Sequence, residues 1–523
     1  MPTLNSLSGP FKQSGKLTIA SFVLLAICLF GRLAEAEYGG GSEIIASAET
    51  STYVFLSEQS KVVKTGGIAG VHETYPIEGQ FRLTVDFDAG MALFSQVDAN
   101  LIDESGLLYE RSLGVIFNMA ELLGTVVDDT IIEFVGKTAD GMESDILLTL
   151  TFRGDSVHLT GRTVPPPNSA DFFIYELDAF ASKKYGGGTG EANGPYLIYT
   201  AEQMNAIGAE PNDWDKHFKL MADVDLSGYT GKDFNIIGTS YDNPFTGVFD
   251  GNGHTISNFT YASTDTFSIG LFGYVDDPNA QIKNLVLIDP NIDAGTAWGV
   301  GSLVGYLDDG TVSNCYVEGG SVSGGEDVGG LVGCNHGTIT RCYTTGSVMG
   351  TISSVGGLVG TNGGTIIHCY ATGSVTGTTN VSGLVGRNEH GEVTDSFWDI
   401  QTSGQTTSAG GIGKTTTEMQ TAGTFLDAGW DFVGESANGT EDIWSICEGT
   451  NYPRLVWQIP AGDFVCPDGI TIEDFLFFIE HWRDDNCDLG NDYCDGTDLD
   501  FSGTVDINDL EIFLENWLAA GND

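Results

Sequence analysis

The sequence predicts a mainly β protein whose largest part is a right-handed parallel β-helix, a solenoid of short stacked strands. Three observations lead to this class. One motif recurs every 27 residues in the middle of the chain, segments of alternating apolar and polar residues precede it, and glycine makes up 72 of 523 residues. Because the every-third-residue glycine pattern of collagen is absent, we expect these glycines in tight turns, where φ is often positive.

The first 36 residues have the composition of an export signal. Lys12 and Lys16 precede the apolar run 17–30, and residues 34–36 (Ala-Glu-Ala) fit a small-x-small cleavage site. The run is too short to cross a bilayer comfortably, and no later stretch is apolar enough for an anchor. We therefore expect residues 1–36 to be a signal peptide. The mature protein would be secreted or held at the bacterial cell surface, without membrane insertion.

Acidic residues dominate the charge of the chain. There are 72 of them against 21 basic residues, which gives a net charge of −51. Nucleic acid and anionic membrane surfaces repel such a chain, and this excludes nucleic acid as a partner. The charge suits an exterior rich in calcium or salt, although it would equally serve solubility alone.

Residues 37–183 are predicted to form a β-sandwich-like domain. The stretches 81–87, 146–152 and 156–160 alternate apolar and polar residues, as half-buried strands do. The glycine-rich stretch 184–195 that follows has the composition of a flexible linker.

The stretch 196–460 is predicted to be the β-helix, with a cap at each end. Thr200 and Gln203 have the spacing of a helix capping box. This predicts a short helix over 201–207 that covers the open end of the first coil. Near the other end, the tryptophan-rich stretch 400–460 breaks the repeat and predicts the closing cap.

Successive coils repeat the same residues. The unit Gly-Thr-Ile/Val-x-x-Cys-Tyr places small side chains and aromatic rings in two columns with a spacing of 27 residues: Cys315, Cys342, Cys369 and Ser396, and Tyr316, Tyr343, Tyr370 and Phe397. One coil alone buries no apolar face, whereas stacked identical residues share a continuous core. We expect the cysteines to be free thiols in the interior, because parallel stacked side chains give poor disulfide geometry.

A second motif, Gly-Leu-Val-Gly, lies between these strands at residues 330–333, 357–360 and 383–386. With it, the coils resemble the GLUG repeat of secreted bacterial proteins over roughly residues 196–400. The resemblance implies a β-helix and says little about activity. Some GLUG proteins are immunoglobulin-A-cleaving peptidases, but the sequence after residues 72–73 (His-Glu) lacks the second histidine of a zinc-peptidase motif.

The C-terminal stretch 461–523 is predicted to hold a calcium-binding loop. Residues 498–509 place oxygen ligands at positions 1, 3, 5, 7, 9 and 12 of a twelve-residue loop, with glycine at position 6. This is EF-hand spacing. The candidate ligands are Asp498, Asp500, Ser502, Thr504 (through its backbone carbonyl), Asp506 and Asp509.

The unit is duplicated, since residues 474–482 match 509–517 at an offset of 35. This arrangement resembles a type I dockerin, a tandem of loop–helix halves, which implies bound Ca²⁺ and a cohesin-like or other cell-surface partner. At the positions where dockerins contact cohesins, residues 472–473 (Ile-Glu) and 507–508 (Ile-Asn) replace the family's hydroxyl pair. The first loop is degenerate, because it lacks acids at positions 3 and 5 and keeps only Asp463, Thr471 and Asp474.

No catalytic residue and no organic cofactor is predicted. Residues 411–415 lack the first glycine of a phosphate-binding loop, and without a CxxC pair the cysteines do not indicate zinc or redox chemistry. One column of polar residues could serve a β-helical polysaccharide hydrolase or lyase, but a variable column facing solvent explains it better. Its members are Asn314, Arg341, His368 and Asp395.

The sequence therefore favours an exported, non-catalytic binding or structural protein. Its β-helix would present a surface to polysaccharide or protein, and its tail would attach it in a calcium-dependent way. The alternative is a polysaccharide-degrading enzyme that carries a dockerin. Successive coils lack the acidic cluster with a matched arginine or lysine that this alternative needs.

Overall fold

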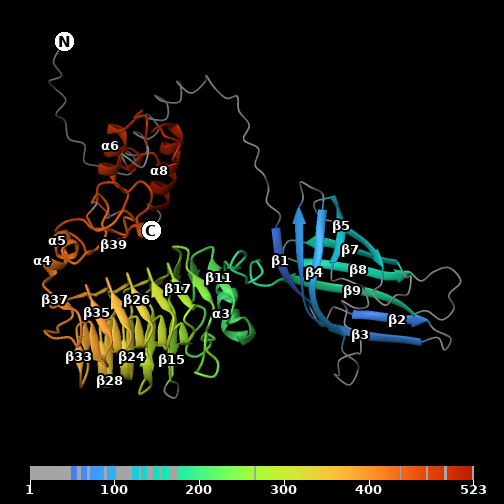
Figure 1. Ribbon diagram of the computed structural model, residues 1–523, viewed down its shortest axis with the longest axis horizontal. Coiled ribbons are helices and arrows are strands. Elements are labelled where there is room, and N and C mark those ends of the chain that lie inside the picture. Colours follow the sequence, from blue (N-terminus) through green and yellow to red (C-terminus); the bar gives the residue numbers. More distant parts are fainter. Residues whose placement is uncertain are drawn as a thin grey trace, which may run out of the picture. The chain divides into compact units, whose positions relative to one another are not determined.

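The structure is a computed structural model (Figure 1). It describes residues 49–55, 61–66, 71–86, 91–101, 121–128, 131–137, 145–153, 156–164, 173–263, 267–435, 437–466, 469–487 and 492–520. The predicted signal peptide, residues 1–36, lies outside these stretches. Among the described residues, no helix has both the length and the apolar character needed to cross a membrane.

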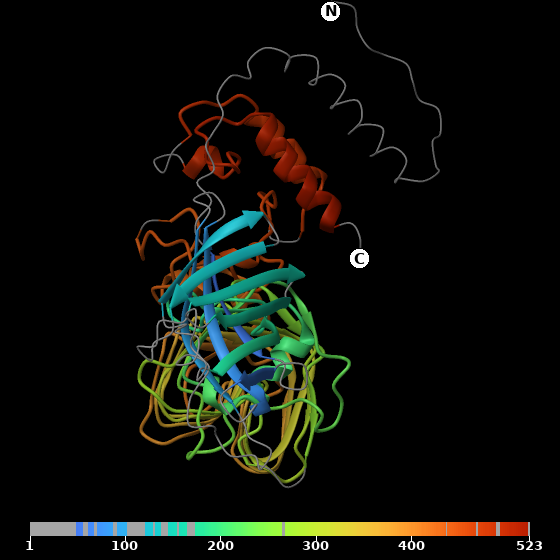
Figure 2. The same ribbon diagram turned by 90° about the vertical axis from the view of Figure 1, so that its right-hand side faces the viewer.

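The first described part is one antiparallel sheet of nine strands (Figure 2). β1 and β2 each pair with both β9 and β3, and β3 also pairs with β4, so the pairing closes into a ring. The strands are β1 (Glu49–Phe55), β2 (Lys61–Gly66), β3 (Val71–Asp86), β4 (Met91–Leu101), β5 (Glu121–Asp128), β6 (Ile131–Lys137), β7 (Asp145–Arg153), β8 (Ser156–Val164) and β9 (Phe173–Lys183). The predicted strands are present, but they join in one sheet and do not form the two sheets of a sandwich. Alternation identifies a half-buried strand and leaves its pairing partner open.

Residues 184–195, expected as a flexible linker, are held by hydrogen bonds. The amide of Gly186 donates to the carbonyl of Leu197 over 2.7 Å. At Gly188, where φ is +86°, a Cβ atom would lie 1.9 Å from the carbonyl oxygen of Pro195. Glycine here permits close backbone contact, which composition alone does not distinguish from flexibility.

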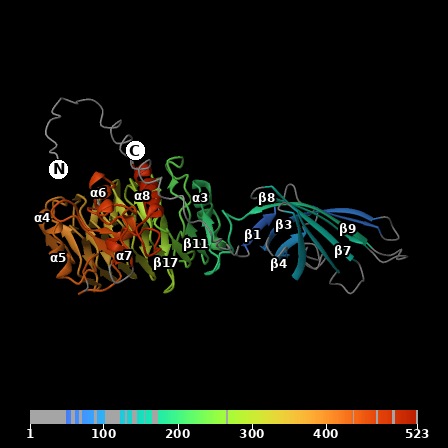
Figure 3. The same ribbon diagram turned by 90° about the horizontal axis from the view of Figure 1, so that it is seen from above.

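The β-helix is built from four parallel sheets that run along the coils, which are stacked in sequence order (Figures 1 and 3). One sheet contains β10 (Tyr196–Ile198), β11 (His217–Leu220), β13 (Val248–Asp250), β17 (Gln281–Lys283), β22 (Thr311–Ser313), β26 (Thr338–Thr340), β30 (Thr365–Ile367) and β35 (Glu392–Thr394). The next contains β12 (Val224–Asp225), β14 (Thr255–Ser257), β18 (Val286–Ile288), β23 (Tyr316–Glu318), β27 (Tyr343–Thr344), β31 (Tyr370–Ala371), β36 (Phe397–Asp399) and β37 (Ile412–Lys414).

The third and fourth sheets complete each coil. The third contains β15 (Thr260–Ala262), β19 (Asn291–Asp293), β20 (Trp298–Val300), β24 (Ser321–Gly329), β28 (Ser347–Gly356), β32 (Val375–Thr376) and β33 (Val381–Ser382). The fourth contains β16 (Phe272–Val275), β21 (Val304–Leu307), β25 (Val332–Asn335), β29 (Val359–Asn362) and β34 (Val385–Asn388). Equivalent residues pair directly, as Tyr316 does with Tyr343 and Tyr343 with Tyr370, so the predicted repeat is the structural repeat.

Small and branched side chains fill the interior of the coils. Cys315, Cys342 and Cys369 are fully buried and take part in no disulfide, as predicted. Each thiol donates to the carbonyl two residues earlier over 3.1–3.2 Å, and the Ser396 hydroxyl does the same over 2.7 Å. The column therefore accepts thiol or hydroxyl, because both satisfy the same buried carbonyl.

The two ends of the β-helix are closed in different ways. Helix α3 (Ala201–Ala209), followed by the short helix η1 (Pro211–Asp213), begins where the Thr200 hydroxyl accepts the Gln203 amide, and it buries Met204 over the first coil. At the other end Trp398 is buried against Gly383, where a Cβ atom would lie 1.9 Å from the indole. The predicted N-terminal covering helix is thus confirmed.

The tryptophan-rich stretch covers the side of the β-helix, whereas the sequence predicted an end cap. It contains α4 (Thr416–Met419), α5 (Ala422–Leu426), β38 (Trp444–Ser445), β39 (Arg454–Leu455) and η2 (Val456–Gln458). The rings of Tyr316, Tyr343 and Tyr370 point out of the coils and stack at 4.8 and 4.7 Å. Trp430 and Trp444 pack on them in one buried cluster. A column of outward-facing aromatic rings needs such a cover, because it would otherwise expose a large apolar patch.

The C-terminal module contains α6 (Ile472–Glu480), α7 (Asp492–Asp495) and α8 (Ile507–Ala520). Its duplication is visible in the packing. The ring centroids of Phe478 and Trp482 lie 5.8 Å apart, and those of the corresponding pair Phe513 and Trp517 lie 5.5 Å apart. The two phenylalanine rings pack on each other at a centroid distance of 5.5 Å. Two disulfides, Cys447–Cys466 and Cys487–Cys494, involve this module.

Candidate metal centre and the coil surface

Three predicted ligands converge in the second loop of the C-terminal module. One carboxylate oxygen from each of Asp498, Asp500 and Asp509 lies within 4.8 Å of the others. Asp498 and Asp509 are buried, and Asp500 is exposed to solvent. Three carboxylates at this separation repel one another unless a cation lies between them, so the site could hold a metal ion.

Backbone amides orient these carboxylates. Asp498 accepts the amides of Ser502 and Gly503 at 3.0 and 2.9 Å. Asp509 accepts the amides of Asp500 and Asp506 at 3.0 and 2.7 Å. Burial raises the pKa of Asp509 above its usual range, although these amides oppose the effect.

The remaining predicted ligands lie outside this triad. The Ser502 hydroxyl donates to the Thr504 carbonyl over 3.2 Å, and both side chains are exposed. The Asp506 carboxylate accepts the amide of Asn508 over 2.8 Å. In an EF-hand loop position 9 often acts through water, and the place of Asp506 is compatible with that role.

The first loop has the same amide contacts but one acid fewer. Asp474 accepts the amides of Val465 and Thr471 at 2.9 and 2.8 Å, which are the same two contacts at the 35-residue offset. It also accepts the Thr471 hydroxyl at 2.8 Å, while the Gly469 amide donates to Asp463 at 3.0 Å. Val465 stands where Asp500 stands in the second loop, so the first loop lacks one of the three converging acids.

The coils themselves match a known repeat. Residues 296–323, 324–349 and 352–376 each match a family described as the GLUG motif. These coils are GLUG repeats. They form the parallel β-helix described above, and they occupy fewer residues than the stretch 196–400 over which the resemblance was expected.

Two curated proteins share part of the sequence. One is halomucin of Haloquadratum walsbyi, which is 33% identical over 193 residues. That match covers 35% of this chain and 2% of the relative. The other is described as a Gly-rich membrane protein of Evansella cellulosilytica and is 34% identical over 190 residues. That match covers 29% of this chain and 21% of the relative. The chain thus spans a small part of either relative's length. No solved structure matches it.

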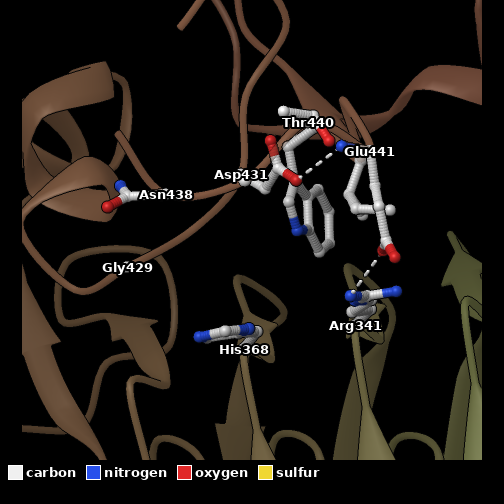
Figure 4. Close-up of a pocket in the computed structure, with 10 residues that line it drawn as sticks. Arg341, His368, Gly429, Asp431, Asn438, Thr440 and Glu441 are labelled. Carbon is white, nitrogen blue, oxygen red and sulfur yellow. Dashed lines mark hydrogen bonds and ion pairs between the residues drawn. The ribbon is translucent and has the colours of Figure 1, made fainter. Parts of the chain in front are cut away.

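The polar column of the GLUG coils contacts the tryptophan-rich stretch 400–460, which we call the lateral cover. Arg341 pairs with Glu441 at 3.2 Å, and Glu441 donates its amide to Asp431 at 3.0 Å (Figure 4). His368 faces the same cavity, which has a volume of about 360 Å³, and its ring lies 5.7 Å from that of Trp430. The sequence predicted a column that faces solvent. The contacts show instead that Arg341 and His368 pack against the lateral cover.

Proposed function

We propose that this protein is an extracellular, non-catalytic GLUG-repeat protein that binds through its coils and is attached through its C-terminal module in a calcium-dependent way. The duplicated loop is the observation that supports calcium-dependent attachment. Both loops orient an acid at position 12 through the same two amides, and in the second loop Asp498 and Asp500 converge on that acid. This duplication and these converging acids support attachment of the dockerin kind.

Calcium is the cation that best suits the second loop. Calcium takes six to eight oxygen ligands, and the triad with the Ser502 hydroxyl, the Thr504 carbonyl and Asp506 would supply such a set. Zinc sites in proteins are built mainly from cysteine and histidine, and the triad contains neither.

An exposed apolar pair supports a protein partner for the module. Ile472 and Ile507, which correspond at the 35-residue offset, are 48% and 44% exposed. Leu476 and Leu518 on the same two helices are 57% and 70% exposed. A cohesin-like or other cell-surface protein would bury such side chains. The two disulfides support an oxidising, extracellular setting.

Calcium titration of the full chain tests the metal site. Calorimetry should show one binding event, and Asp500→Asn should weaken it about tenfold or more because it removes a charge without changing shape. The matched control Glu511→Gln removes an exposed acid on α8 and should leave the affinity unchanged. The proposal would be wrong if calorimetry of the unaltered chain showed no heat of calcium binding. It would also be wrong if Asp500→Asn bound calcium as tightly as the unaltered chain.

A further inference from the structure

A second cavity lies on the coils, away from the lateral cover. Its volume is about 340 Å³, within the range of sites that hold small molecules. Five of its lining residues form one column of the fourth sheet, in which equivalent residues of successive coils pair: Tyr274, Tyr306, Cys334, Thr361 and Arg387. We refer to this cavity as the sheet groove.

Aromatic rings line one wall of the sheet groove. Trp298 is 53% exposed and packs edge-on against Phe267, which is 58% exposed, at a centroid distance of 4.9 Å. Tyr274 and Tyr306 stack in parallel at 4.9 Å. Exposed indole and phenyl rings at the rim of a cavity are costly to leave in water, and flat apolar ligand faces pack well on them.

Charged and hydrogen-bonding side chains form another part of the lining. The guanidinium of Arg387 lies 3.1 Å from the Glu389 carboxylate and 4.0 Å from that of Asp327. Asp327 is 9% exposed and accepts the hydroxyl of Thr361. The Nε atom of Arg387 is buried and has no hydrogen-bond partner among the described residues. The groove thus offers carboxylate acceptors that are already oriented, beside a guanidinium side chain that is 42% exposed.

The combination of a flat aromatic wall and charged hydrogen-bonding groups fits a sugar ring. The C–H face of a pyranose packs on an aromatic ring, while its hydroxyls donate to carboxylates in charge-assisted hydrogen bonds. Charge selects the class of sugar. Arg387 is already paired with two acids, and the chain carries a net charge of −51, so an anionic sugar is repelled.

We propose that the sheet groove is a binding site for a neutral oligosaccharide segment, with Trp298 as the stacking platform and Glu389, Asp327 and Arg387 as the hydroxyl-binding wall. This inference deepens the binding role proposed for the coils and rests on it. It is independent of the metal loop, whose residues do not line the groove.

Calorimetry on the full chain with neutral and anionic hexasaccharides tests the site. Cellohexaose, xylohexaose and mannohexaose serve as neutral probes, and hexagalacturonate serves as the anionic probe. At least one neutral probe should bind more tightly than hexagalacturonate. Trp298→Ala should weaken that binding about tenfold or more, as loss of a central tryptophan does elsewhere, and Trp298→Phe should restore part of it.

Two further variants keep the result interpretable. Met349→Ala removes a side chain of the same coils that is 51% exposed and lies outside the groove, and it should bind as the unaltered chain does. Asp500→Asn should also keep its sugar affinity, which separates failure of the groove from failure of the metal site. No binding of any neutral probe, tighter binding of hexagalacturonate, or equal affinity in Trp298→Ala would each overturn the proposal.

Discussion

At the corners between strands, single residues hold a backbone conformation that most amino acids avoid. Asn314, Arg341, His368 and Asp395 have φ between 47° and 55°. A left-handed residue costs about 1–2 kcal/mol for most side chains, and less for Asn and Asp. The sequence showed this column as variable. Asn314 and Asp395 are residue types that favour a left-handed conformation. That preference indicates a corner only when the strands on either side are known.

His368 should make the stability of the protein depend on pH. Burial lowers the pKa of His368, despite the opposing charge of Asp395. The folded state therefore disfavours the protonated ring, so stability is highest above the unfolded pKa of about 6.5 and falls as pH drops through the unfolded pKa toward the folded one. His368→Asn keeps a residue suited to the left-handed corner and should reduce this loss. Urea unfolding at pH 7.5 and pH 5 measures it.

The matched control is His390→Asn. His390 is exposed and also has positive φ, so the exchange should leave the pH dependence of unfolding unchanged. An equal loss of stability on acidification in His368→Asn and in the unaltered chain would contradict the prediction.

The sequence identified the three acids that converge in the C-terminal loop, but it did not identify the groove. EF-hand spacing is local, so Asp498, Asp500 and Asp509 could be named from one loop. Trp298 and Arg387 belong to different coils and meet only through the register of the sheets. Aligning the coils on the Gly-Leu-Val-Gly motif would have placed Arg387 in the column of Tyr306, and this is the signal that was missed.

At the element scale, the coils approach one another so closely that some positions admit only glycine. A Cβ atom at Gly373 would lie 1.7 Å from the carbonyl oxygen of Gly346 in the preceding coil. The obstructing oxygen belongs to the backbone, so no side chain can move aside. The period of 27 residues was predictable because each coil repeats these contacts, whereas the ring of β1 to β9 was not, because its long-range pairings leave no repeat in the sequence.

Gly373→Ala should therefore destabilise the β-helix by roughly 1–3 kcal/mol, the usual cost of overpacking. Gly423→Ala provides the control, since Gly423 lies in α5 and a methyl group added there would have no atom within 4 Å. That exchange should stabilise by about 0.5–1 kcal/mol, the helix preference of alanine over glycine. Chemical unfolding followed by far-UV circular dichroism measures both. A neutral Gly373→Ala would contradict the close stacking.

At the scale of the whole molecule, like charges oppose folding. A net charge of −51 creates repulsion that salt screens over about 10 Å at 0.1 M ionic strength. The melting temperature should therefore rise between about 0.05 and 0.5 M NaCl, by several degrees on the scale at which 1 kcal/mol shifts Tm by about 2–4 °C. Differential scanning calorimetry in the presence of a chelator isolates this effect from metal binding. A constant or falling Tm would show that the charges are too dispersed to matter.

The Cys447–Cys466 disulfide gives the tail a second connection to the lateral cover, across a sequence separation of 19 residues. If a partner holds the tail while ligand drags on the coils, tension runs through the sulfur bridge and bypasses the intervening backbone. It enters the cover beside Trp444 and spreads over the stacked tyrosines. The bridge would thus carry the load into this buried aromatic cluster without drawing it through residues 448–465, whose Leu455 packs in the same cluster.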